Sequence, residues 1–144
     1  MNAGNTGIMD AAAVGALAAG LLVEACGDGA DPLSGTVRGL GEDLGRALRP
    51  ASGAGTADAL VGAALACADL ATLAACNAAA LPGRGGPSAV AATHLAAGAA
   101  RALAALGEAE LEARDDAYAG NALRDLRSAG WKAGLAVRQL GEAG

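Results

Sequence analysis

The sequence predicts an all-α fold, a bundle of about five helices, and three observations carry this prediction. No stretch alternates apolar and polar residues in the way that a half-buried strand does. Apolar residues instead recur at three- and four-residue spacing along most of the chain. Glycine, proline and capping residues stand where these stretches end and begin. Because the chain has 144 residues, we expect a single domain.

Three helices are expected in the first part of the chain. The first, over 9–26, is apolar on nearly every side, which predicts that other helices surround it. The second, over 32–48, follows Asp31-Pro32, a pair typical of a helix start, and its single apolar stripe marks an outer helix. The third, over 57–80, is long and carries Asp69 near its middle.

Two further helices are expected after a glycine-rich turn at 82–86. Pro87 can occupy the first turn of a helix over 87–106, because its fixed backbone angle suits that position. Gly107 is the residue expected to cap this helix at its carboxyl end. The last helical region is expected over 108–140.

The composition leaves one copy of the chain with little bulk to bury. Alanine accounts for 43 residues and glycine for 23, and there is no phenylalanine. A buried leucine contributes roughly 1.5–3 kcal/mol, whereas an alanine methyl contributes a fraction of that. We therefore expect a homodimer, in which a second copy covers part of the apolar surface. The excess of arginine over lysine is typical of a GC-rich genome, and we expect a bacterial source.

Charge and cysteine content exclude several classes of function. The net charge of −5 argues against a nucleic-acid partner, because phosphate binding requires clustered basic residues. Three cysteines without metal-type spacing favour reduced thiols in a cytosolic protein. Five acidic residues lie between 108 and 116, but none stands three positions before His94, the single histidine, as a di-metal bundle would need. We therefore expect no metal and no resident cofactor.

A membrane location is also not expected. The amino-terminal ten residues lack a basic segment and include Asp10, so they do not resemble a signal peptide. The stretch 59–81 is long enough to span a bilayer, but Asp69 would place a charge at its centre at a cost of roughly 2.5–3.5 kcal/mol. We interpret this stretch as a buried helix of a cytoplasmic protein.

A small group of residues could carry chemistry. Arg84, Gly85, Gly86 and Ser88 stand at the start of a helix, where backbone amides can bind a carboxylate or phosphate; alternatively, they form only a tight connection. His94 is the first candidate for proton transfer, and the alternative is a structural histidine. Asp69 is either exposed or paired with an arginine, or else a polar group in a small pocket.

Two stretches of the chain match the motifs of one enzyme family in order and spacing. The first corresponds to G-N-P-N-A-[VI]-S-D followed by G-V-A-A-L-L-A-x-A, and is carried by Gly86-Pro87-Ser88-Ala89-Val90, Leu95-Ala96-Ala97 and Ala100-Arg101-Ala102. The second corresponds to P-G-G-G-S-V-A-A-L-A-G-A-L, and is carried by Gly7, Ala11, Ala12, Gly15, Ala16, Leu17, Ala19 and Leu21. In these stretches the chain resembles the cyclodeaminase/cyclohydrolase family, the carboxyl-terminal domain of formiminotransferase-cyclodeaminase.

The resemblance implies an all-α dimer that binds or acts on a tetrahydrofolate-type one-carbon compound, or on a similar small anion. On this hypothesis His94 and Asp69 would be catalytic, and Arg84, Gly85, Gly86 and Ser88 would bind the ligand. The acidic residue of the family motif is absent, because its serine–aspartate pair falls on Ala91-Ala92. The chain is also shorter than such domains. The alternative hypothesis is a non-catalytic helical homodimer that serves as a scaffold or protein-interaction module.

Overall fold

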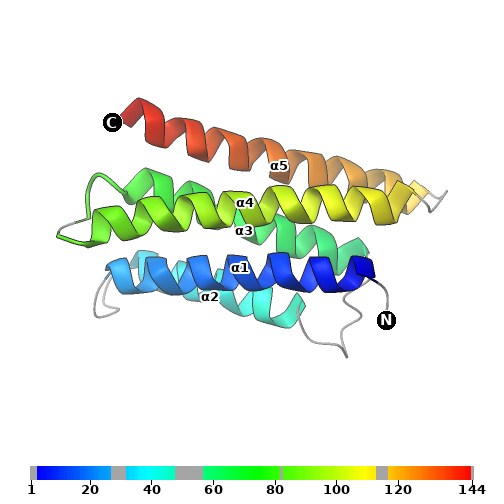
Figure 1. The fold of residues 1–144 in the computed structure, drawn as a ribbon, viewed down its shortest axis with the longest axis horizontal. Coiled ribbons are helices and arrows are strands. Elements are labelled where there is room, and N and C mark those ends of the chain that lie inside the picture. The colour runs from blue at the N-terminus through cyan, green and yellow to red at the C-terminus, as the bar shows by residue number, and fades with distance from the viewer. Residues whose placement is uncertain (1–2, 27–31, 48–56, 82, 113–116, 144) are drawn as a thin grey trace.

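The protein folds as five α-helices in the residues that its computed structural model describes, which are 3–26, 32–47, 57–81, 83–112 and 117–143 (Figure 1). The helices are α1 (Ala3–Cys26), α2 (Pro32–Ala47), α3 (Ala57–Asn77), α4 (Gly85–Glu112) and α5 (Ala117–Ala143). No strand occurs in these ranges. The prediction of an all-α bundle is therefore confirmed.

Helices α3 and α4 form the middle of the bundle. They pack against each other, and α5 packs against both of them on one side, as Figure 1 shows. On the other side α1 lies along α4, and α2 packs against both α1 and α3 at the edge of the bundle. Helix α2 thus packs mainly against two helices, which agrees with the outer position that its single apolar stripe predicts.

One helix boundary differs from the prediction for a clear physical reason. Helix α4 does not end near Leu106 but continues through Gly107 to Glu112, so the capping role expected of Gly107 is wrong. Gly107 is buried, and a Cβ atom added there would lie 2.7 Å from Cδ1 of Leu126 on α5. The glycine therefore leaves room for α5 to approach α4 closely.

The last helical region, expected over 108–140, instead begins at Ala117 and ends at Ala143, because residues 108–112 belong to α4. The remaining boundaries shift by smaller amounts. Helix α1 begins at Ala3 rather than at residue 9, and α3 ends at Asn77 rather than at residue 80. The carbonyl of Asn77 accepts hydrogen bonds from the amides of Ala80 and Leu81 at 3.1 and 3.2 Å, which closes α3 with a turn. Helix α2 begins at Pro32 as expected, whereas residues 31 and 48 lie outside the described residues.

Alanine makes up most of the core, and a few larger side chains fill the remaining space. The largest fully buried side chains are Leu22, Leu60, Leu70, Leu103, Leu111, Leu126, Val37, Thr93 and Cys67. Thr93 is the one buried polar residue among the described positions, and its hydroxyl donates a hydrogen bond of 2.8 Å to the carbonyl of Ala89. Such small side chains allow close helix packing but contribute little apolar area each.

The two described cysteines occupy opposite environments. Cys76 is exposed on α3, and its sulfur accepts a hydrogen bond of 3.4 Å from Nε2 of Gln139 on α5. Cys67 is buried, and desolvation raises the pKa of its thiol from 9.0 to about 12. Both thiols are free, as expected for a reduced protein.

Because Cys67 is buried, the free energy of unfolding is expected to depend on pH in the alkaline range. An unfolded thiol ionises near pH 9 while the buried one stays protonated up to about pH 12, so unfolding releases a proton between these values. Below pH 9 the thiol is protonated in both states and does not change the free energy of unfolding. As the pH rises from 9 to 12, the free energy of unfolding falls by about 4 kcal/mol. We expect Cys67→Ala to be less sensitive than wild type to pH in this window, as measured by urea denaturation. Equal pH dependence of the two proteins would contradict a buried, protonated thiol.

Within the described ranges, three helical stretches are long and apolar enough to cross a membrane, judged by length and composition alone. They are Gly7–Ala25, Ala59–Asn77 and Gly85–Glu112. In each of them only part of the surface is buried inside the bundle. The cytoplasmic location expected from Asp69 stays a prediction.

Candidate functional site

The glycine-rich turn brings three helix ends close together. Gly83 has a φ of 58°, a backbone conformation that favours glycine because it has no Cβ. A Cβ added to Gly85 would lie 2.9 Å from the carbonyl oxygen of Ala25 at the end of α1. A Cβ added to Gly86 would lie 3.0 Å from the carbonyl oxygen of Ala78, just after α3. Close packing of the backbone thus accounts for glycine at both positions.

The polar groups of the predicted anion site lie around this turn. The side chain of Arg84 is exposed, and Ser88 is half-buried. The amide of Ser88 donates a hydrogen bond of 3.1 Å to the carbonyl of Arg84, so this amide is already engaged within the first helical turn. The ligand-binding role of Arg84, Gly85, Gly86 and Ser88 stays a prediction.

The two predicted catalytic residues lie on the central helix pair. Asp69 is half-buried on α3. His94 is exposed on α4, on the same face as Val90, Gly98 and Arg101, as helical spacing predicts. No ion pair or hydrogen bond joins Asp69 to His94 within the described part of the chain. Catalysis by these residues, and the binding of a folate-type compound near them, also stay predictions.

The packing of the turn leads to a test that compares a closely packed glycine with an open one. Gly85→Ala is expected to destabilise the protein by about 1–3 kcal/mol, because its Cβ would press on backbone that cannot move aside cheaply. Gly62→Ala on α3 is the matched control: a Cβ there meets no atom within 4 Å, so we expect up to about 1 kcal/mol of stabilisation. Denaturant titration measures both, and a neutral Gly85→Ala would contradict the close approach of α1 and α4.

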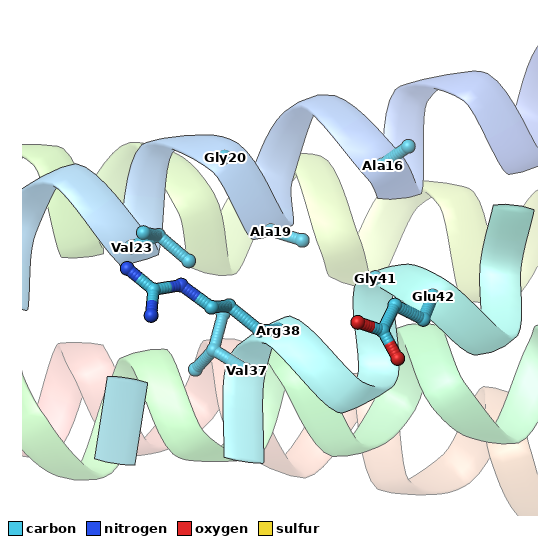
Figure 2. Close-up of a pocket in the computed structure, with 8 residues that line it drawn as sticks. All are labelled: Ala16, Ala19, Gly20, Val23, Val37, Arg38, Gly41 and Glu42. Carbon is cyan, nitrogen blue, oxygen red and sulfur yellow. The ribbon is translucent and has the colours of Figure 1, made fainter. Parts of the chain in front are cut away.

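A hollow between α1 and α2 is a second candidate site, and sequence analysis missed it. Its volume is about 340 Å³, and Figure 2 shows the eight residues that line it. The lining residues are Ala16, Ala19, Gly20, Val23, Val37, Arg38, Gly41 and Glu42. Small residues on both helices were the available signal, but only the fold shows that these particular faces meet.

The hollow has an apolar floor and two charged side chains at its edge. Val37 is fully buried at the base, whereas Arg38 and Glu42 are exposed. In Figure 2 the side chain of Arg38 extends toward Val23 on α1, away from Glu42. Glu42 stands one helical turn further along α2, so a cation and an anion flank the apolar floor.

A third feature is an apolar face formed by α1 and α4. Four large side chains on these neighbouring helices are well exposed: Met9 at 40%, Leu17 at 66%, Val90 at 39% and Leu95 at 38%. Exposed small residues lie on the same two helices, namely Ala13, Ala91 and Gly98. We call these seven residues the apolar face. Two other exposed large side chains, Trp131 and Leu135, belong to α5 and lie outside it.

Comparisons of the chain with models of protein families, with curated proteins and with solved structures found no match. The likeness to the cyclodeaminase/cyclohydrolase family therefore rests on the motif residues within 7–21 and 86–102 alone and stays a prediction. The strongest guide to function is the geometry of the described residues, above all the exposed apolar surface of α1 and α4.

Proposed function

We propose that the protein is a non-catalytic helical homodimer that serves as a scaffold or protein-interaction module. The observation that carries this proposal is the apolar face of α1 and α4. Leu17 has two-thirds of its surface in solvent, while the interior of the bundle is built mainly from alanine. Removing a leucine side chain from water contributes roughly 1.5–3 kcal/mol. Association of two copies through this face would therefore bury apolar surface that the alanine-rich interior of one copy does not provide.

The relative direction of α1 and α4 determines which residues of the apolar face lie at the same height along the two helix axes. Gly7 on α1 lies against Leu106 on α4, and Gly85 on α4 lies against Ala25 on α1. The two helices are therefore antiparallel, and Leu17 comes level with Leu95 near the middle of the face. An exposed leucine on the same face as exposed small residues is suited to knob-into-hole packing.

Charge on the two helices favours one way of pairing two copies. The exposed charged residues of α1 between positions 7 and 25 are both acidic, Asp10 and Glu24. Along the part of α4 that lies beside α1, the exposed ionisable residues are His94 and Arg101, and Arg84 stands just before the helix. The acidic groups thus belong to α1 and the basic ones to α4 and the turn before it, with the guanidinium of Arg101 reaching over Gly134 of α5.

A two-fold axis parallel to the helices would bring the acidic residues of one copy near the basic residues of the other. Most homodimers are two-fold symmetric, and two faces can meet around an axis parallel or perpendicular to their helices. The parallel axis places α1 of one copy on α4 of its partner, which sets acidic residues opposite basic ones. The perpendicular axis places α1 on α1 and α4 on α4, which sets like charges together. Electrostatic complementarity therefore favours the parallel axis.

Sedimentation equilibrium of the full chain tests the proposal. We expect a mass of twice the 13.6 kDa of one chain, and weaker association at high salt, because part of the complementarity is between exposed charges. A single-chain mass at every concentration that can be reached would overturn the proposal.

A further inference from the structure

We propose that the hollow between α1 and α2 binds a small zwitterion with an aliphatic side chain, of which free leucine is the representative. This inference does not depend on the homodimer. It rests on the floor, the flanking charges and the size of the hollow.

The floor of the hollow is apolar and left open by small residues. Val23 and Ala16, both half-buried, supply aliphatic surface, and the buried side chains of Val37 and Ala19 lie beneath them (Figure 2). A Cβ added to Gly20 would meet no atom within 4 Å, so the space above this glycine is open. An aliphatic side chain of a ligand could therefore lie against the floor without displacing protein atoms.

The two flanking charges are poorly placed to neutralise each other. Arg38 precedes Glu42 by four residues, and on a helix this order of cation before anion is the less favourable one. Figure 2 shows the guanidinium directed toward α1 and away from the carboxylate. Among the described residues neither side chain forms an ion pair. A carboxylate at the Arg38 end and an ammonium at the Glu42 end would pair with both.

An open hollow of this volume has room for a ligand of amino-acid size. Pockets for drug-sized ligands span roughly 300–1,000 Å³, and the 340 Å³ of this hollow is near the lower limit. An aliphatic α-amino acid carries an anion, a cation and a branched apolar group within such a volume. It therefore matches the three features of the hollow together.

Titration of the isotope-labelled full chain with leucine, followed by amide chemical shifts, tests the inference. We expect saturable shifts in the α1–α2 region with a dissociation constant of about a millimolar, because the site is open to solvent. Arg38→Gln and Glu42→Gln should each weaken binding by about fivefold, the loss typical of one exposed ion pair. Gly20→Leu should abolish binding by filling the hollow, whereas Gly62→Leu, an equally open helical glycine on α3, should leave it unchanged.

Analogues with one charge complete the experiment. 4-Methylpentanoate and 3-methylbutylamine each keep the aliphatic group and one charge of leucine, and each should bind about fivefold more weakly. Equal binding of either analogue, unchanged binding to Gly20→Leu, or no saturable shift with leucine would each overturn the inference. If Gly20→Leu does not fold, as circular dichroism would reveal, the two polar variants of α2 decide the question.

Discussion

Replacing Leu17 with glutamate is expected to separate the proposed dimer into single chains. Leu17 is 66% exposed in one copy and stands near the middle of the apolar face, so it would be covered by α4 of the partner. A glutamate there would bury an unpaired charge, which costs several kcal/mol. Each 1.4 kcal/mol corresponds to a factor of ten, so the dissociation constant should rise at least about 100-fold.

The control for this variant uses another exposed leucine. Leu135→Glu makes the same chemical change on α5, where the side chain is 36% exposed and lies outside the apolar face. Sedimentation equilibrium should show single chains for Leu17→Glu and dimers for Leu135→Glu. Both variants should keep the helical content of wild type, because both positions are solvent-exposed in one copy. Equal association of the two variants would show that another surface joins the copies.

Replacing Leu103 with alanine is expected to cost about 2–5 kcal/mol of stability. Leu103 lies on α4 and has no exposed surface, and it is one of few large side chains in a core of alanines. Alanine neighbours have no flexible side chain with which to fill a cavity, which favours the upper part of that range. Urea denaturation measures the loss.

Leu135→Ala on α5 serves as the matched control for this cavity, because the side chain already lies partly in solvent. It should cost less than about 1 kcal/mol, because surface substitutions have small effects. A loss for Leu103→Ala no larger than that of the control would contradict the position of this side chain at the centre of the bundle.

The sequence was sufficient for the fold class because the strongest signals for it are local. Absence of strand alternation, helical spacing of leucine and valine, and Pro32 at a helix start all act within a few residues, and the structure confirms each of them. The error at Gly107 has the opposite origin. A glycine that caps a helix and a glycine that admits a neighbouring helix look alike in sequence, and only the approach of Leu126 distinguishes them.

The candidate sites depend on contacts between segments that are far apart in the chain, so sequence could indicate them only in part. Gly85 and Gly86 stand out in the sequence as part of a turn, but the carbonyl oxygens that a Cβ there would meet belong to Ala25 and Ala78. The helical face shared by His94 and Arg101 was predictable from their spacing. The hollow was not, because it exists only where α1 and α2 meet, at the approach of Gly41 to Ala19.

Cross-linking between two single-cysteine chains tests most directly how two copies would pair. One chain carries Leu17→Cys and the other Leu95→Cys, each with the native Cys26, Cys67 and Cys76 replaced by alanine. If α1 packs on α4 of the partner, mixing the chains under mild oxidation should give mainly a disulfide between the two different chains. Preferential cross-linking of Leu17→Cys to itself, or no cross-link in the mixture, would contradict the proposed pairing.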